Sequence, residues 1–270
     1  MVKKAIIPAA GFGTRGLPIT KVIPKEMFPV GLKPAIQLVI EEAVNSGIEE
    51  ILIIVSRTKS LIIDYLDSSL ELESFLEKNN KSHLKQKLTL PKAQILYTRQ
   101  PFAKGLGDAI HLGKNFVGKD PFAVLLPDDI IINKNGSCLQ ELIDLHHRTS
   151  SSVIGLKKVD EHSTKNYGVI SGIEMKNNEY ELEDIVEKPL TNPPSNLAVI
   201  GRYIFNPDIM HHLEDVTPGH GNEIQLTDAI KELLNSQKVY GKVISGTRYD
   251  IGIEKEYMKL LTRHYRELES

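Results

Sequence analysis

Short apolar runs alternate with helix-like segments through the first 150 residues. The run "EILIIVS" is apolar at consecutive positions, which is typical of a strand covered on both faces. The segment "AIQLVIEEAVN" has apolar residues at helical spacing and is followed by Ser46-Gly47, a common signal for the end of a helix. These patterns predict strands at Lys4–Ala9, 50–56, 93–100 and 121–129, and helices at Ala35–Asn45, within 58–88 and at Gly107–Lys114. Strands that alternate with helices in this way predict an α/β fold with a parallel sheet.

The pattern changes after residue 150, where strand-like runs follow one another closely with polar turns between them. The runs predict strands at 151–159, 167–175, 180–188, 197–205 and 239–245, and helices at 223–236 and 254–268. Closely spaced strands favour antiparallel pairing, because antiparallel neighbours need only short turns. We therefore expect one α/β domain over residues 1–270, with a Rossmann-like mixed, mainly parallel sheet flanked by helices. Additional antiparallel strands are expected in its C-terminal half.

Composition excludes several classes of protein. The chain has 33 basic and 35 acidic residues and a formal net charge of −2, so no overall basic field is present to hold nucleic acid. Its one cysteine, Cys138, excludes an internal disulfide and a cysteine-based zinc site, and we expect a packed, unreactive thiol near the start of a helix. No apolar stretch approaches the roughly 18 residues of a membrane span. We expect a cytoplasmic protein with no nucleic-acid or membrane partner.

A glycine-rich loop follows the first strand. "GFGTRG" has the glycine spacing of a dinucleotide-binding fingerprint, which requires a helix directly after the loop. Four prolines between residues 18 and 34 prevent a sustained helix there. The second strand ends "VSR", without the acidic residue that would bind a ribose, and the loop lacks the Lys-Ser/Thr ending of a P-loop. The loop is therefore expected to bind the phosphates of another kind of ligand. The groups that would bind them are the backbone amides and the side chains of Thr14, Arg15, Lys21 and Lys25.

The stretch "PAAGFGTRGLPITKVIPKEMFPVGLKP" resembles the signature loop of the sugar-phosphate nucleotidyltransferases. The later motifs "RQPFAKGLGDAI", "LPDD", "YGVI", "VEKP", "SNLAVIGRYIF", "GNEIQLTDAI" and "YDIG" follow in the order of one subgroup. Together they resemble the bacterial UTP–glucose-1-phosphate uridylyltransferases over residues 3–265. One departure is Leu32, where the family usually has an acidic residue.

The resemblance implies an enzyme that makes UDP-glucose and pyrophosphate from UTP and glucose 1-phosphate with Mg²⁺. It implies a nucleotide-binding half at about 1–150, a sugar-phosphate-binding half at about 151–270, and a homodimer or homotetramer. Two alternatives stay open: a thymidylyltransferase or other hexose-1-phosphate nucleotidyltransferase, and a catalytically silent regulatory subunit that binds nucleotide sugar. Arg15, Lys25, Asp128 and Asp250, present together, favour the active enzyme over the silent subunit.

The reaction would add negative charge to the α-phosphate and the leaving pyrophosphate, so it needs positioned cations and a metal. By resemblance, Arg15 holds the leaving phosphates and Lys25 lies near the α-phosphate. Asp128 and Asp129 follow the apolar run "FAVLLP", and ligands of α/β sheets bind at that end of the strands. Adjacent side chains on an extended segment point opposite ways. The resemblance selects Asp128, with Asp250, as the Mg²⁺ ligands, and a contribution from Asp129 stays open.

Gln100 follows the third strand, and its amide can both donate and accept, as a uracil edge requires. In "VEKP", the carboxylate of Glu187 can accept hydrogen bonds from sugar hydroxyls, and the ammonium of Lys188 can bind the sugar phosphate. The resemblance adds Ala10, Gly11, Gly13, Thr14, Arg15 and Gly105 to the nucleotide pocket, and Gly168 and Gly201 beside the hexose. The pairs His146-His147 and His211-His212 lack metal-ligand spacing and are expected on helix surfaces.

Overall fold

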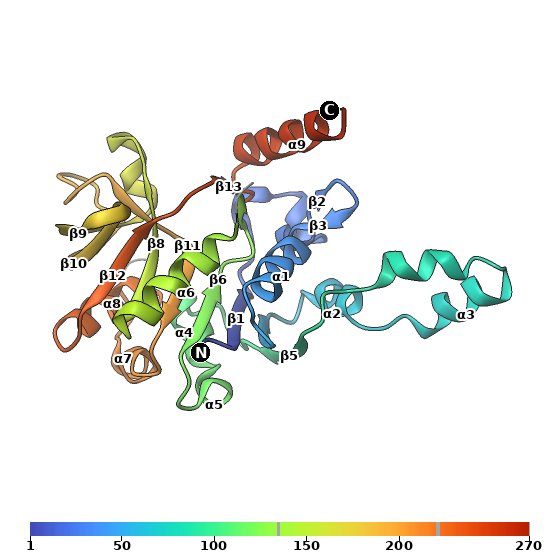
Figure 1. Ribbon diagram of the computed structural model, residues 1–270, viewed down its shortest axis with the longest axis horizontal. Helices are drawn as coiled ribbons and strands as arrows, with labels where there is room; N and C mark the ends of the chain where they lie inside the picture. Colours follow the sequence, from blue (N-terminus) through green and yellow to red (C-terminus); the bar gives the residue numbers. More distant parts are fainter. Residues whose placement is uncertain (134–135, 220–221, 270) are drawn as a thin grey trace.

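The structure is a computed structural model that describes residues 1–133, 136–219 and 222–269. Its centre is a nine-stranded sheet with the order β5-β4-β1-β6-β11-β8-β12-β10-β9 (Figure 1). The strands are β1 (Lys4–Ala9), β4 (Glu50–Val55), β5 (Gln94–Arg99), β6 (Phe122–Leu125), β8 (Ser152–Lys158), β9 (Gly168–Glu174), β10 (Glu179–Glu187), β11 (Leu197–Phe205) and β12 (Val239–Val243). Every one of them overlaps a strand that the hydrophobic pattern predicts.

The sheet combines a parallel part with a mainly antiparallel part. Strands β5, β4, β1 and β6 are parallel, as expected for the first half of the chain. Strand β11 lies antiparallel between β6 and β8, and β10 pairs antiparallel with β9 and β12, whereas β8 and β12 are parallel. The expected mixed α/β sheet with antiparallel strands added in the C-terminal half is confirmed.

Helices cover both faces of the sheet. Alternate residues of each strand point to opposite faces, so Ile7 and Ile53 belong to one buried cluster and Ile6 and Ile54 to the other. Helices α1 (Ala35–Asn45) and α6 (Cys138–Thr149) cover the first face. Helices α4 (Leu106–His111), α5 (Lys114–Val117), α7 (Ile209–Asp215) and α8 (Leu226–Leu234) contribute buried residues on the second. Both cores are formed by residues from the two halves of the sequence.

Two further parts complete the fold (Figure 1). Helix α2 (Ser60–Leu66) buries Ile62 and Leu66 in the first cluster, whereas α3 (Leu70–Lys78) and the 3-10 segment Ser82–Leu88 extend away from the sheet. A ribbon of β7 (Asp129–Ile132) and β13 (Thr247–Asp250) precedes helix α9 (Glu254–Glu269), which lies near the short strands β2 (Pro29–Val30) and β3 (Lys33–Pro34). In the part of the chain described, no helix is both long and apolar enough to span a membrane.

Several local predictions can be compared with this structure. Residues 17–34 form only short turns, 3-10 segments and the β2–β3 pair, so the prolines do prevent a helix. Cys138 begins α6 and is buried, and burial raises the pKa of its thiol well above the ordinary value, as expected of an unreactive cysteine. The prediction for His146 is wrong, because this ring is buried and its Nδ1 lies 2.8 Å from the carbonyl oxygen of Ser151. The motif "GNEIQLTDAI" begins at Gly221, outside the described residues.

A fully buried arginine ties α1 to the centre of the sheet. Arg202 in β11 is 0% exposed, and its Nε and Nη2 donate to Oε2 of Glu42 at 3.1 and 2.7 Å. Its other donors bond the carbonyl oxygens of Leu126, Gly201 and Asp129 at 3.2, 3.0 and 2.9 Å. All five N–H groups of the guanidinium therefore have acceptors, which is the condition for burying such a charge.

Arg202→Met should lower the free energy of unfolding by about 3–5 kcal/mol, because it leaves the largely buried Glu42 carboxylate without its ionic partner. Chemical denaturation followed by circular dichroism measures the change. Lys3→Met is the matched control, since Lys3 pairs with Glu49 at the surface and such pairs contribute at most about 1 kcal/mol. An Arg202→Met protein that unfolds at the wild-type denaturant concentration would contradict the argument.

Candidate active site

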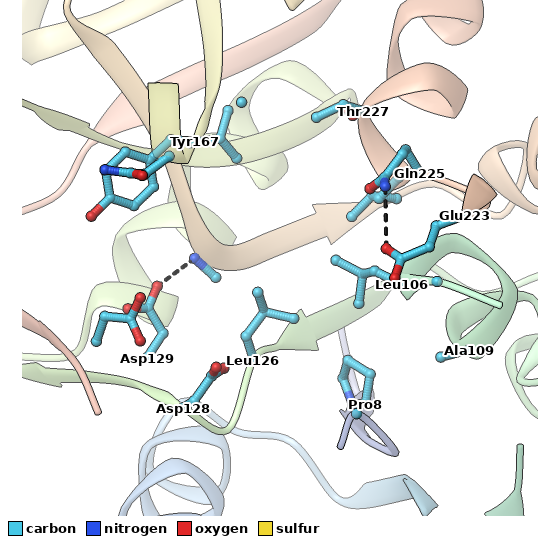
Figure 2. A pocket seen from close by; sticks show the side chains of 18 of the residues that line it. Pro8, Leu106, Ala109, Leu126, Asp128, Asp129, Tyr167, Glu223, Gln225 and Thr227 are labelled. Carbon is cyan, nitrogen blue, oxygen red and sulfur yellow. Dashed lines mark hydrogen bonds between the residues drawn. The ribbon is translucent and has the colours of Figure 1, made fainter. Parts of the chain in front are cut away.

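A cleft of about 740 Å³ opens at the carboxyl ends of the parallel strands. Asp128, Asp129 and Tyr167 lie on one side of it, and Leu106, Glu223 and Gln225 on the other (Figure 2). Fourteen of the residues that the sequence assigns to the site line this cleft: Ala10, Gly11, Gly13, Thr14, Arg15, Lys25, Gln100, Gly105, Asp128, Gly168, Glu187, Lys188, Gly201 and Asp250. The expectation for Lys21 is wrong, because this side chain is exposed and does not line the cleft. Residues from the whole length of the chain thus meet in one space.

The loop after β1 brings its cations into the cleft by folding into compact turns. Gly13 has a φ of 69°, a left-handed conformation that glycine adopts readily. Its carbonyl oxygen accepts hydrogen bonds from the amide of Gly16 at 2.9 Å and from the hydroxyl of Thr20 at 2.8 Å. A 3-10 turn at Ile19–Lys21 then leads to a second one that begins at Lys25. Hydrogen bonds within the loop, rather than a helix, therefore fix its conformation.

Each loop cation is paired with a carboxylate from another part of the chain. Nζ of Lys25 lies 2.5 Å from Oδ2 of Asp128, and Nη1 of Arg15 lies 3.2 Å from Oδ2 of Asp250. Burial alone would raise the pKa of Asp128, but the charge and hydrogen bond of the Lys25 ammonium, together with a backbone hydrogen bond and the charge of Arg15, hold that pKa below its ordinary value. Burial likewise opposes the charge of Lys25, yet Asp128 and Glu26 raise its pKa. The Lys25–Asp128 pair is therefore ionised at neutral pH.

Asp128 and Asp250 are held close together by the backbone and repel one another. The amide of Ile251 donates to the carbonyl oxygen of Asp128 at 2.9 Å, which ties the two acidic segments together. Burial raises the pKa of Asp250, and the negative charge of Asp128 raises it further, against the opposing effects of Arg15 and Arg248. A divalent cation between the two carboxylates would relieve this repulsion.

The donor set fits Mg²⁺. Magnesium prefers oxygen ligands and commonly binds one or two carboxylates together with phosphate oxygens and water. Among the residues described, no group of three or more His, Cys, Asp or Glu side chains is placed to hold a metal. Asp128 and Asp250 would therefore hold a cation only together with a phosphate-bearing ligand or water.

Asp129 has a different environment from Asp128, as the opposite directions of neighbouring side chains predict. Its Oδ2 accepts a hydrogen bond from the amide of Gly201 at 2.7 Å, and its Oδ1 forms an ion pair with Nε of Arg248. Arg248 also donates to the hydroxyl of Tyr167 at 3.0 Å and lies over that ring. Asp129 therefore links Gly201 of β11 to Arg248 of β13 in the wall of the cleft.

Gln100 lies at the end of β5 and is almost fully buried. Its Nε2 donates to the carbonyl oxygen of Gly105 at 3.2 Å and to Oδ2 of Asp108 at 2.7 Å. Two acceptors around one amide nitrogen fix the orientation of the side chain. Gly105 has a φ of 108°, and a Cβ there would lie 2.6 Å from the carbonyl oxygen of Ile224. Because glycine has no side chain, the backbone of residue 105 can pack directly against the backbone of Ile224 in this wall of the cleft.

On the opposite side, β9 and β10 bring Gly168 and Glu187 into register. Oε1 of Glu187 lies 3.1 Å from Nζ of Lys188. Lys188 has a φ of 45°, an uncommon conformation for a residue with a side chain, and its amide donates to the carbonyl oxygen of Tyr167 at 2.9 Å. The carboxylate and the ammonium thus face the cleft as a pair.

The sequence analysis did not identify several residues that line the cleft, among them Glu26, Tyr203, Thr227 and Arg248. Arg248 could have been found, because it stands two residues before Asp250 in a strand-like run and alternate residues share a face. Glu26 forms a buried ion pair with Lys59, 2.6 Å apart, and no spacing in the sequence connects these two residues.

The chain is similar to known proteins over nearly its whole length. The family model described as nucleotidyl transferase matches residues 4–266. A protein of Bacillus subtilis (strain 168), provisionally named a UTP–glucose-1-phosphate uridylyltransferase, is 56% identical over 97% of this chain and 96% of its own length.

Two solved structures are also similar. A UDP-glucose pyrophosphorylase complexed with UDP-glucose has a TM-score of 0.89 at 40% identity, over 99% of this chain and all of that one. The UTP-bound enzyme of Acinetobacter baumannii has a TM-score of 0.89 at 37% identity, over 98% of this chain and 93% of that one. With a family model matching nearly its whole length, the chain belongs to the nucleotidyl transferase family.

Proposed function

We propose that this protein transfers a uridylyl group from UTP to glucose 1-phosphate and releases pyrophosphate. The observation that carries the proposal is the pairing of Lys25 with Asp128 and of Arg15 with Asp250 in the cleft that Glu187 and Lys188 also line. The relatives' names and the UTP and UDP-glucose complexes of similar structures support it. A regulatory subunit without activity would not need both cation–carboxylate pairs.

The charges on the two substrates decide which side chains the proposed reaction needs. The attacking oxygen of the sugar phosphate is already ionised at neutral pH, so no general base is needed. Lys25 is the catalytic residue at the α-phosphate, where negative charge grows in the transition state, and Arg15 binds the departing phosphates. When bound to Asp128 and Asp250, Mg²⁺ would neutralise charge on the phosphate oxygens. Glu187 and Lys188 bind the hexose hydroxyls and the sugar phosphate.

Base recognition follows from the orientation of Gln100. Because Nε2 is held by Gly105 and Asp108, the oxygen Oε1 is left to accept the N3–H of uracil. Cytosine has an acceptor at N3 and would be rejected, whereas thymine has the same edge as uracil. We also propose that the protein acts in the cytoplasm as a homodimer or homotetramer, and that residues 1–270 form a single catalytic domain.

The decisive experiment measures pyrophosphate release for UTP, dTTP, CTP and ATP against several sugar 1-phosphates. Release with UTP and glucose 1-phosphate above all other pairs would support the proposal. Preference for dTTP would favour a thymidylyltransferase, and absence of release with every pair would favour the silent subunit.

Lys25→Ala should lower kcat by about 100-fold, because an electrostatic contact that strengthens in the transition state is lost. Lys188→Ala should instead raise KM for glucose 1-phosphate, since its contact exists already in the ground state. Steady-state kinetics with each substrate varied in turn separates the two effects. Lys21→Ala is the control from the same loop, where the side chain is exposed. An increase confined to the KM for UTP in Lys188→Ala would require the two phosphate assignments to be exchanged.

Asp128→Asn or Asp250→Asn should abolish most turnover while the fold is retained, because each removes a charged ligand for Mg²⁺. EDTA should abolish the activity of the wild type, and added Mg²⁺ should restore it. Calorimetry should show weaker binding of Mg²⁺ with UTP by either variant. Full activity in EDTA would exclude the metal assignment.

Gln100→Ala should reduce the preference for UTP over CTP more than it slows turnover of UTP. A site that pairs each polar group of its ligand rejects the wrong base strongly, and removal of the pairing side chain relaxes that choice. The ratio of kcat/KM for the two nucleotides measures the effect, with exposed Gln94→Ala at the start of β5 as the control. If the preference is unchanged, the base is recognised by backbone groups instead.

A further inference from the structure

The carboxylate of Glu187 is held by a second partner besides Lys188. Its Oε2 accepts a hydrogen bond from the hydroxyl of Thr227 at 3.1 Å, while Oε1 lies 3.1 Å from Nζ of Lys188. The last torsion of a glutamate side chain has a broad distribution of angles. Lys188 alone would therefore leave the plane of the carboxylate free to turn, and the bond from Thr227 fixes it.

Thr227 is itself held in place by its surroundings. It lies in the first turn of α8 and is 9% exposed, and its neighbours Leu226, Ala229 and Ile230 are buried in the core. Figure 2 shows it beside Gln225 on the upper right of the cleft. The segment that leads into α8 is bonded to the nucleotide side, because the amide of Ile224 donates to the carbonyl oxygen of Lys104 at 2.7 Å. The hydroxyl is therefore attached to a rigid part of the molecule.

The neighbouring glycine makes room for this contact. A Cβ at Gly168 would lie 2.8 Å from Cγ2 of Thr227 and 3.4 Å from Oε2 of Glu187. A side chain at residue 168 would push Thr227 away from the carboxylate. The strand register, which places Gly168 opposite Glu187, thus forms a corner that the side chains of Glu187 and Thr227 fill together.

We propose that Thr227 is a positioning residue that sets the hexose selectivity of the cleft by orienting Glu187; this rests on the proposed function. A threonine hydroxyl has one donor and two acceptor lone pairs, and here the donor is used by Glu187. The lone pairs of Thr227 and the oxygens of Glu187 then form a fixed set of acceptors for adjacent sugar hydroxyls. An epimer of glucose 1-phosphate presents one hydroxyl in another direction and leaves an acceptor unpaired, which is costly in a buried site.

Thr227→Val keeps the shape of the side chain and removes the hydroxyl, whereas Thr227→Ser keeps the hydroxyl. Thr227→Val should raise KM for glucose 1-phosphate about tenfold, in the range expected for a hydrogen bond to a charged group. Its kcat and its KM for UTP should stay within about twofold, and its preference for glucose 1-phosphate over galactose 1-phosphate should fall. Thr227→Ser should restore both the KM and the preference to near the wild-type values. Exposed Thr262→Val in α9 is the matched control.

Thermal unfolding of each variant separates a local effect from loss of fold, since a merely structural threonine would change stability without changing the choice of hexose. An unchanged preference in folded Thr227→Val, or a loss in Thr227→Ser as large as in Thr227→Val, would overturn the inference. Binding of UDP-glucose and UDP by calorimetry tests the same point without turnover, because only UDP-glucose should bind Thr227→Val more weakly. A wild type that makes no UDP-glucose would overturn the proposed function itself, and the inference with it.

Discussion

Two carboxylates that repel one another are confined at one end of the sheet, and the arrangement of the cleft depends on how their charge is balanced. Asp128 and Asp250 approach because the backbone of Ile251 is bonded to that of Asp128. Lys25 and Arg15 supply the balancing charge. In the proposed function, the same lysine and arginine would bind the phosphates of UTP. A bound triphosphate could then exchange partners with both pairs, which would limit the change of net charge in the site.

The scaffold keeps this arrangement in place through buried polar contacts rather than through packing alone. The β7–β13 ribbon sets Asp250 opposite Asp129, and Asp129 in turn holds the amide of Gly201. Arg202 bonds the carbonyl oxygens on both sides of this region, at Leu126 and Asp129, and is anchored by Glu42. Parallel strands direct their carboxyl ends to one edge, which is why the acidic segment after β6 and the glycine loop after β1 meet there.

Much of this could be predicted from the sequence because it depends on local patterns. The bounds of β1 and α1 follow from apolar runs that end at turn residues, and the prolines after the glycine loop exclude a helix. The start of α8 was less predictable. The pattern extends a helix back to residue 223, but the backbone of Ile224 is bonded to Lys104 and Gly107, and the helix begins at Leu226. A tertiary contact between distant segments overrides the local preference there.

Contacts between distant segments also limit how much of the site can be predicted from the sequence. Lys25, Asp128 and Asp250 stand in motifs, and their type and position indicate their chemistry. Asp129 pairs with Arg248, 119 residues further along the chain, and Glu187 accepts a hydrogen bond from Thr227, 40 residues further along. The spacing of Arg248 from Asp250 could indicate that Arg248 faces the site, but no pattern in the sequence indicates either of these two contacts.

The contact between Ile224 and the loop that contains Gly105 also joins the two sides of the cleft. The amide of Ile224 donates to the carbonyl oxygen of Lys104 at 2.7 Å, and the amide of Gly107 donates to the carbonyl oxygen of Ile224 at 2.9 Å. Gly105 is bonded to Gln100 on the nucleotide side, and three residues beyond Ile224, Thr227 holds Glu187 on the sugar side. The residues proposed to recognise the base and the sugar are therefore linked by one series of backbone and side-chain hydrogen bonds. A change that moves the 104–107 loop is therefore expected to shift the carboxylate of Glu187 as well, so the fold would set the distance between the two proposed substrate sites.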